Sequence, residues 1–363
     1  MATDAALGHS ALQTPLLDAH RSSGANIGEW FGCALPSDFG DWRAEYQFAR
    51  ESVALLDKNY RAYLSFAGLD RVRYLNAILT NNIKDLKTGE GIVSLFLNPQ
   101  GRIQAEIETY AEESKLLCVS FAMIREKLIP ALDHFIIMDD VTLTDESARY
   151  GTLALEGPRA AEIVKQIAKI ELGNLPEPGW KDSQVGSIPC RVIRRSSSGN
   201  PGAEFLCEQS YLPALWNLLL EAAKASGGGP AGYMALNALR LESGIPWFGY
   251  DFSEKQIPHE AGLENSHISY TKGCYTGQEI VERVRSRGQV NRVRALFQLS
   301  APELPAAETP ILFDGKEVGF ITRAANSPAF QSNIAMGYVR REQSVLGSKL
   351  LICGADAVVI APR

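Results

Sequence analysis

Residues 272–279 read Lys-Gly-Cys-Tyr-Thr-Gly-Gln-Glu and run directly into Ile-Val-Glu-Arg-Val at 280–284. Thr276 stands three residues before Glu279, which is the spacing of a capping box: the hydroxyl accepts from a first-turn N–H while the carboxylate reaches back. A helix is therefore predicted to begin at about Gly277. The positive end of such a helix favours a negative group placed just before it.

Cys274 lies just before this predicted helix and close to Lys272. Both neighbours favour the thiolate over the thiol, provided that the side chain is partly exposed. Gly273 and Gly277 on either side lack bulk, so a ligand or the backbone can approach the sulfur. Two interpretations stay open: a presented, reactive cysteine, or a cysteine that fills space before an ordinary capped helix.

The same region is rich in positive charge. This excess is compatible with binding of phosphate, a polyglutamate tail or nucleic acid, and equally with a solvated helix face. Between 272 and 294 the basic residues are Lys272, Arg283, Arg285, Arg287, Arg292 and Arg294, against Glu279 and Glu282.

The composition of the chain limits its fold class, its location and the ligands expected for it. The chain has 363 residues, 45% hydrophobic and 21% charged, which is enough apolar material for more than one core. Its formal charge of −6 argues against a chain that coats nucleic acid or an anionic membrane. No apolar run is long enough to span a bilayer and the start lacks an export signal, so a cytoplasmic protein is predicted. The six cysteines contain no Cys-x-x-Cys pair, so no stable metal is expected.

Hydrophobic periodicity predicts two similar α+β segments on antiparallel sheets, 27–150 and 151–288, after an N-terminal arm, 1–26. Ordered structure is expected from about Gly28, and 176–186 is interpreted as a connector. In the first segment the predicted strands are 60–67, 91–97, 103–110 and 116–121, and the predicted helices 46–56, 71–79 and 124–135. In the second the strands are 150–155, 188–194 and 203–208, and the helices 160–170, 212–225 and 232–242.

After Gly288 the sequence pattern changes to short predicted strands of alternating polar and apolar residues, separated by Gly and Pro turns. Helix-length periodicity is missing from this part. Residues 289–363 are therefore predicted to form a small antiparallel β-barrel or sandwich.

The stretch 272–281, followed by Arg283, Gly288 and Asn291-Arg292, resembles the signature of the YgfZ folate-binding proteins. These proteins belong to the glycine-cleavage T-protein (aminomethyltransferase) superfamily. Similarity to that superfamily runs almost end to end. It includes Thr14-Pro15-Leu16 with His20, Gly68-Leu69-Asp70, Thr80-Asn81-Asn82-Ile83, Leu97-Asn98 with Gly101, Leu155-Glu156-Gly157-Pro158, residues 239–244 and Pro258-His259-Glu260.

The resemblance implies an α+β fold: two ferredoxin-like α+β segments around a central folate pocket, plus a C-terminal antiparallel β-barrel. The implied cofactor is tetrahydrofolate or a one-carbon derivative. The implied role is that of an accessory protein for iron–sulfur cluster assembly or repair and, through cluster enzymes, for tRNA modification. Its partners would be folate and iron–sulfur assembly factors or cluster enzymes. The charge of −6 and the lack of an RNA-binding signature argue against direct nucleic acid contact.

Several residues match functional positions of the superfamily. Glu204 matches the pterin-binding carboxylate, and a Glu can accept two parallel N–H bonds from an aminopyrimidinone ring. Arg240 is a second candidate for the pocket, with pairing to Glu242 or another carboxylate as the alternative. The resemblance gives Cys274 and Lys272 as candidate catalytic residues and Glu204, Arg240, Tyr275, Gln278 and Glu279 as candidate cofactor-binding residues.

One departure separates the branches of the superfamily. Ala105 stands where the transferases carry an Asp that acts on the folate nitrogen chemistry, and an alanine cannot accept a proton. Glu106 points to the opposite face of the strand, so it does not simply substitute. Whether the chain is an enzyme stays open. The alternatives are a folate-dependent aminomethyltransferase or demethylase using Glu106 or another base, and an interaction module that folate only stabilises.

Overall fold

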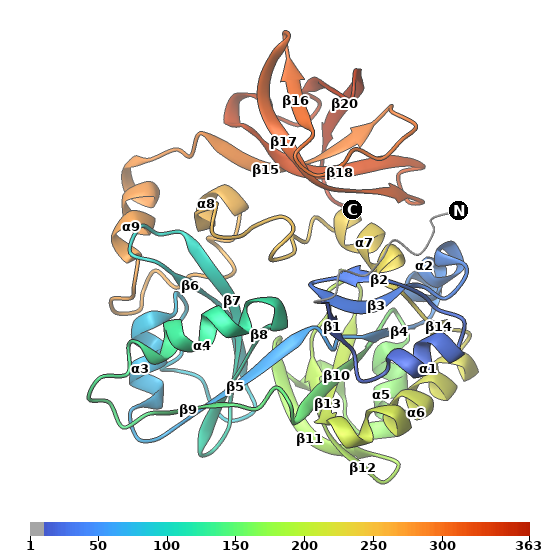
Figure 1. Cartoon of the computed structure of the whole chain (residues 1–363), viewed down its shortest axis with the longest axis vertical. Helices are drawn as coiled ribbons and strands as arrows, with labels where there is room; N and C mark the ends of the chain where they lie inside the picture. Colours follow the sequence, from blue (N-terminus) through green and yellow to red (C-terminus); the bar gives the residue numbers. More distant parts are fainter. Residues whose placement is uncertain (1–10) are drawn as a thin grey trace. The chain divides into compact units, whose positions relative to one another are not determined.

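The computed structural model describes residues 11–363, and Figure 1 labels its helices and strands. Contacts between residues divide the chain into two compact units, each drawn from three stretches of sequence. Unit 1 comprises Met1–Leu75, Ile83–Val93 and Ile107–Leu236. Unit 2 comprises Asn76–Asn82, Ser94–Glu106 and Asn237–Arg363.

Unit 1 starts with a small sheet in the order β1-β3-β2. Its elements are β1 (Leu12–Gln13), helix α1 (Leu17–Ser22), β2 (Asn26–Trp30) and β3 (Cys33–Asp38). Ordered structure thus begins before the predicted Gly28, because Leu16 and Leu17 are buried and fix α1. Of the predicted arm, residues 1–10 lie outside the described part.

The main sheet of unit 1 has six strands in the order β11-β12-β13-β10-β4-β14. Helices α5 and α6 share one hydrophobic core with it, and β10 supplies the fully buried Leu153 and Leu155. The strands are β4 (Ala54–Asp57), β10 (Tyr150–Glu156), β11 (Gly179–Val185), β12 (Ile188–Arg194), β13 (Gly202–Glu208) and β14 (Gly229–Pro230). The helices are α2 (Trp42–Glu51), α5 (Ala160–Ala168), α6 (Leu212–Ala225), η2 (Leu172–Asn174) and η3 (Gln209–Tyr211).

A five-stranded sheet has the order β6-β7-β8-β5-β9. The predicted hairpin is confirmed: the Asn98 side chain accepts from the Gln100 and Arg102 amides at 3.0 and 2.9 Å, and Gly101 has φ +72°. The strands are β5 (Arg61–Ala67), β6 (Gly91–Leu97), β7 (Ile103–Ala111), β8 (Lys115–Phe121) and β9 (Thr142–Asp145). The helices are α3 (Arg71–Ile78), η1 (Ala122–Ile124) and α4 (Arg125–Asp133).

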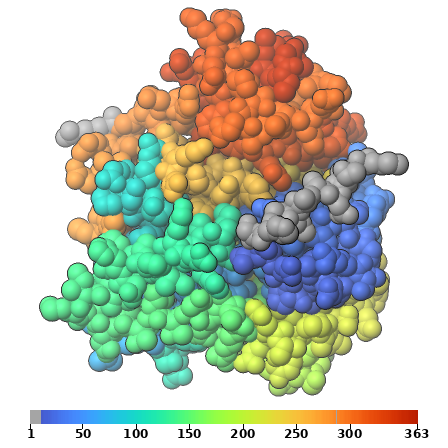
Figure 2. Space-filling view, viewed as in Figure 1, coloured from blue at the N-terminus to red at the C-terminus, as the bar shows by residue number. Residues whose placement is uncertain are grey.

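The C-terminal part of unit 2 is a closed barrel in the order β15-β18-β17-β16-β19-β20, drawn in orange to red in Figures 1 and 2. Alternate residues such as Phe297, Ile321 and Val339 fill its interior, as the predicted alternation requires. Its elements are β15 (Arg292–Leu299), β16 (Pro310–Phe313), β17 (Lys316–Ser327), β18 (Ser332–Arg340), η4 (Arg341–Gln343), β19 (Lys349–Ile352) and β20 (Ala355–Ile360).

Three further helices precede the barrel: α7 (Tyr233–Glu242), α8 (Pro258–Ala261) and α9 (Gln278–Arg287). The mixed α+β class with a C-terminal antiparallel barrel is therefore confirmed. Within residues 11–363, no helix is both long and apolar enough to cross a membrane.

One predicted connector is in fact a strand. Residues 179–185 form β11 and pair with β12 over their whole length. As the edge strand of its sheet, β11 buries Trp180 and Val185 but exposes most residues between them, so its sequence lacks a clean apolar alternation. The connector interpretation of 176–186 was wrong for this reason.

Candidate functional site

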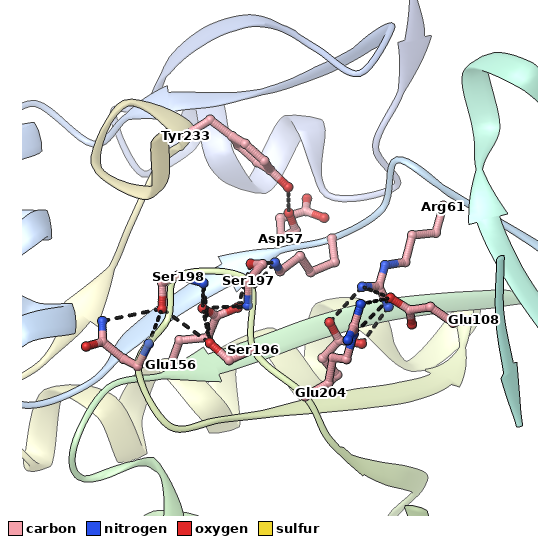
Figure 3. A network of polar contacts seen from close by, with 12 residues as sticks. Asp57, Arg61, Glu108, Glu156, Ser196, Ser197, Ser198, Glu204 and Tyr233 are labelled. Atoms are coloured by element: carbon pink, nitrogen blue, oxygen red, sulfur yellow. Dashed lines mark hydrogen bonds and ion pairs between the residues drawn. The ribbon is translucent and has the colours of Figure 1, made fainter. Parts of the chain in front are cut away.

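Glu204 lies on β13, inside the six-stranded sheet, and its side chain is fully buried. It accepts a two-point fork from Arg61, the first residue of β5: Nη1 donates to Oε2 at 2.5 Å and Nη2 to Oε1 at 2.7 Å. Figure 3 shows the two side chains facing each other. A bidentate guanidinium–carboxylate pair is a strong and directional contact. The carboxylate is therefore held in one orientation.

Glu108 is the second carboxylate near Arg61, with 3.7 Å between Arg61 Nη2 and Glu108 Oε1. Arg195 Nε and the Tyr110 hydroxyl donate to Glu108 at 3.0 and 2.7 Å. Burial would raise the pKa of Glu108, but Arg195 and Arg61 outweigh it and lower the pKa to about 2. Burial would likewise lower the pKa of Arg61, yet Glu204 and Glu108 raise it well above its ordinary value. Glu108 and Arg61 therefore stay charged at neutral pH.

A second buried ion pair fixes the loop between β12 and β13. Glu156, at the end of β10, lies 3.2 Å from Lys58 Nζ, and both side chains are fully buried. The carboxylate also accepts from the Ser196 hydroxyl at 2.9 Å, the Ser197 hydroxyl at 2.8 Å and the Ser198 amide at 2.8 Å (Figure 3). Lys58 and the serines lower the pKa of Glu156 to about 2 against the opposing effect of burial. The serine loop that leads into β13 is thereby held rigidly.

Thr14 and His20, which match the superfamily pattern, have a structural role in unit 1. The Thr14 hydroxyl and His20 Nε2 both contact Asp57 Oδ2, at 2.6 and 2.8 Å. The Tyr233 hydroxyl donates to the backbone carbonyl of Asp57 at 2.6 Å (Figure 3). These contacts fasten the end of β4, which precedes Lys58 and Arg61 in the chain.

The motif at 272–279 packs against the hairpin turn within unit 2. A Cβ on Gly277 would lie 2.6 Å from the Asn98 carbonyl oxygen, and a Cβ on Gly101 would lie 2.9 Å from the Ile280 side chain. Gly277 also has φ +81°, a conformation that favours glycine. The two glycines are therefore required by this close approach of the motif to the turn.

The predicted capping box is absent. Gly277 is the N-cap of α9 and no side chain caps the helix; Glu279 instead binds Arg283 at 2.7 Å. The helix starts where Gly277 approaches the Asn98 carbonyl closely, and not because of the spacing of Thr276 and Glu279. Gln278 Oε1 accepts from the Tyr275 amide at 3.3 Å, and Tyr275 is buried. The roles of Tyr275, Gln278 and Glu279 toward a cofactor stay predictions.

Lys272 and Cys274 lie in different surroundings, which indicate different roles. Lys272 Nζ donates to three backbone carbonyls, those of Asn76, Leu79 and Asn81. Burial lowers the pKa of Lys272 to about 8. Cys274 is exposed, whereas four of the other five cysteines are buried. The lysine thus anchors the end of α3 and the backbone that follows it, and the thiol is open to solvent.

The hairpin strand β7 carries the position where an acid was expected. Ala105 is fully buried. The next residue, Glu106, binds His267 Nε2 at 2.9 Å, and His267 Nδ1 lies 2.7 Å from the Ser266 hydroxyl. A carboxylate, an imidazole and a hydroxyl in sequence can hold or relay a proton. The sequence indicated Glu106 as a candidate base, but its contact with His267 was not predicted.

Arg240 is fully buried on α7. Its guanidinium donates to Asn237 Oδ1, to the Ile245 carbonyl and to Asp251, and it stacks 4.4 Å from the Trp247 ring. Burial lowers its pKa to about 10. As the alternative to a pocket role, the sequence predicted that Arg240 pairs with Glu242 or a neighbouring carboxylate. In the structure its carboxylate partner is Asp251. A cofactor contact would require these bonds to break.

A cavity of about 560 Å³ in unit 1 contains none of the predicted site residues. Most of its lining comes from β8, β10, β11, β12 and β13, including Tyr150, Cys190, Arg191 and Cys207. The part of the chain that the structure describes holds no group of three or more His, Cys, Asp or Glu placed to bind a metal ion.

Sequence and structure comparisons give consistent matches. Residues 16–268 match the GCVT N-terminal domain and residues 292–358 match the glycine cleavage T-protein C-terminal barrel domain. An aminomethyltransferase of Moorella thermoacetica is 29% identical over 329 residues, covering 90% of this chain and 89% of that protein. Another from Rubrobacter xylanophilus is 28% identical, covering 91% and 87%.

The fold also matches a solved structure. The crystal structure of glycine cleavage system aminomethyltransferase T from Bartonella henselae superimposes with a TM-score of 0.85 at 21% identity, covering 97% of each chain. At this identity the match shows the fold.

Proposed function

Because the chain belongs to the glycine cleavage T-protein family, we propose that it binds tetrahydrofolate or a one-carbon derivative through Glu204 and acts on the one-carbon unit in the manner of an aminomethyltransferase. The family match and the relatives named aminomethyltransferase support the reaction class. The observation that carries the folate part is the orientation of the buried Glu204 carboxylate.

The residues present fit a pterin. The 2-amino-4-oxopyrimidine edge of a pterin presents two parallel N–H donors, as a guanidinium does. Glu204 already accepts such a pair, from Arg61 at 2.5 and 2.7 Å. The guanidinium therefore stands in for the ring edge and supports a carboxylate placed for two-point recognition.

When bound, tetrahydrofolate supplies a ring nitrogen that accepts the one-carbon unit. Glu204 would bind and orient the pterin edge in a region from which burial excludes water. The rigid serine loop, held by Glu156, would keep β13 in place. Glu106, with His267 at 2.9 Å, is the group proposed to hold or accept a proton in the reaction.

Release of ammonia from an aminomethyl donor, dependent on tetrahydrofolate, tests this proposal. The protein is expected to release ammonia only when folate is present. A Glu106→Gln variant is expected to be slower by roughly 100-fold or more, the usual contribution of a general acid or base. Glu126→Gln, at an exposed glutamate of α4, is the control and is expected to keep the rate. Absence of folate-dependent ammonia release would contradict the proposed reaction.

A second candidate function is favoured by two observations. Ala105 places a buried methyl group where an acid was expected, and Cys274 is an exposed thiol in a YgfZ-like motif. They support an accessory protein of iron–sulfur cluster assembly or repair in the cytoplasm, which would indirectly serve tRNA modification. Its expected pattern is folate binding without ammonia release, and a fall in cluster-enzyme activity in cells carrying Cys274→Ser. Normal cluster-enzyme activity in those cells would contradict it.

A further inference from the structure

We propose that Arg61 is an internal competitor for the ligand of Glu204, so that a pterin binds only when the Arg61 guanidinium leaves Glu204 and moves to Glu108. This inference rests on the proposed function, because it assumes that Glu204 receives the pterin edge. It adds a residue that controls affinity and selectivity at that position.

Arg61 already occupies the acceptors of Glu204. Both oxygens of Glu204 accept from Arg61, one from each terminal nitrogen. Glu204 is fully buried and the Arg61 side chain is only 8% exposed, so the fork leaves no open side for a second two-point donor. A planar guanidinium and an aminopyrimidinone edge present the same pair of donors, so they exclude one another at a single carboxylate.

Glu108 offers the Arg61 guanidinium a second carboxylate close by. Glu108 Oε1 lies 3.7 Å from Arg61 Nη2, which is within ion-pair range but beyond a direct hydrogen bond. A small rotation of the guanidinium would convert this contact into a hydrogen bond. Moving a buried charge without a partner would be costly, and here the guanidinium never loses a carboxylate. Glu108 itself stays fixed by Arg195 and Tyr110.

The exchange also selects the ligand. An incoming group that offers a single donor cannot replace both hydrogen bonds of the fork, so Glu204 would keep Arg61. A ligand with a cyclic guanidine edge can replace both. The class admitted is therefore the pterins, together with any purine of the guanine type, which shares that edge.

The test is calorimetric titration with tetrahydrofolate of the wild-type protein and of the Arg61→Met variant. The variant leaves Glu204 without its internal donor, so its affinity for tetrahydrofolate is expected to rise at least about tenfold. Arg191→Met is the matched control, because Arg191 also binds two carboxylates of unit 1, Asp182 and Glu112, but does not touch Glu204. Its affinity is expected to equal that of the wild type.

Glu108 gives an independent readout. Glu108→Gln removes the charge that receives Arg61, so the affinity for tetrahydrofolate is expected to fall, although Glu108 does not touch the ligand in this scheme. In the double variant with Arg61→Met the same change is expected to have no effect. A purely structural role of Glu108 would lower the affinity in both backgrounds.

Free guanidinium ion provides a third readout. In Arg61→Ala, millimolar guanidinium is expected to fill the vacated space and to weaken tetrahydrofolate binding competitively. In the wild type the same concentration is expected to have no effect. Guanosine is expected to bind Arg61→Met, because both Glu204 oxygens then lack their internal donor, and absence of binding would contradict the admission of guanine-type purines.

The outcomes separate the two proposals. Equal affinities of wild type and Arg61→Met, or a weaker variant, would overturn the competitor role while folate binding stands. Absence of binding in every variant would overturn the proposed function itself. If Arg61→Met does not fold, Arg61→Lys carries the test: it keeps the charge but lacks the fork, and an affinity no higher than that of the wild type would overturn the proposal.

Discussion

Replacing Lys272 with methionine tests whether this lysine anchors the backbone or activates the neighbouring thiol. Its Nζ donates to the carbonyls of Asn76, Leu79 and Asn81, at 2.5, 2.5 and 3.0 Å. Methionine keeps the unbranched apolar stem and removes the ammonium. The three carbonyls then lose their donor, and the turn that they form after α3 is expected to open more often.

The magnitude follows from two opposing effects. Hydrogen bonds to a charged group contribute about 1.5–3 kcal/mol each, so three contribute roughly 6 kcal/mol. Burial opposes these bonds, because it disfavours the ammonium and lowers the pKa of Lys272 to about 8. If burial offsets about half of the hydrogen-bond contribution, the net loss of about 3 kcal/mol is a roughly 100-fold change in the local opening equilibrium.

Amide hydrogen exchange at Thr80 reports this opening, because its N–H donates to the Leu95 carbonyl at 3.0 Å within unit 2. Exchange is expected to be about 100-fold faster in Lys272→Met. Lys255→Met, at a lysine whose side chain is 72% exposed, is the control and is expected to leave it unchanged. Unchanged exchange together with slower alkylation of Cys274 would refute the anchoring role and favour electrostatic activation of the thiol.

Three further predictions concern stability. Glu156→Gln is expected to lower the free energy of unfolding of unit 1 by about 3–5 kcal/mol in a urea titration, because Lys58 would stay buried without a countercharge; a loss below about 1 kcal/mol would contradict this. Folding lowers the pKa of Glu156 from 4.5 to about 2, so the stabilisation that its carboxylate contributes is expected to be complete above about pH 4.5 and to vanish toward pH 2. If Glu156→Gln lowers the urea midpoint equally at pH 5 and pH 2, this pH dependence is contradicted. Gly277→Ala is expected to cost about 2–3 kcal/mol from its positive φ and the 2.6 Å approach to Asn98, while Gly273→Ala, with open space around it, is expected to be nearly neutral in the same titration.

The sequence was sufficient for strands that are short and separated by recognisable turns. The β6–β7 hairpin is joined by Asn98-Pro99-Gln100-Gly101, and the barrel strands are separated by Gly and Pro turns, so both were predicted. β4 has four consecutive buried residues and β11 is a polar edge strand, and neither pattern has a period of two. Their assignment depends on which strands they pair with, and that information is not local.

The candidate site was predictable only in part, because its contacts join residues far apart in the chain. Glu204 was identified from its match to the superfamily, but its partner Arg61 is 143 residues away. Glu106 and His267 are separated by 161 residues and were not linked. The capping box at Thr276 failed because a tertiary approach at Gly277 outweighed a local preference. Arg61 and Glu156 are charged residues at the ends of otherwise apolar strands, and this was the only pattern in the sequence that could have indicated their buried ion pairs.

Titration of tetrahydrofolate into the wild-type protein and into Glu204→Gln, followed by calorimetry, tests recognition of the pterin by Glu204 most directly. The wild type is expected to bind, and the glutamine variant, whose amide offers one acceptor in place of two, is expected to bind at least about tenfold more weakly while remaining folded. Equal binding by the two proteins, or no binding by the wild type, would contradict the assignment of Glu204 as the pterin carboxylate.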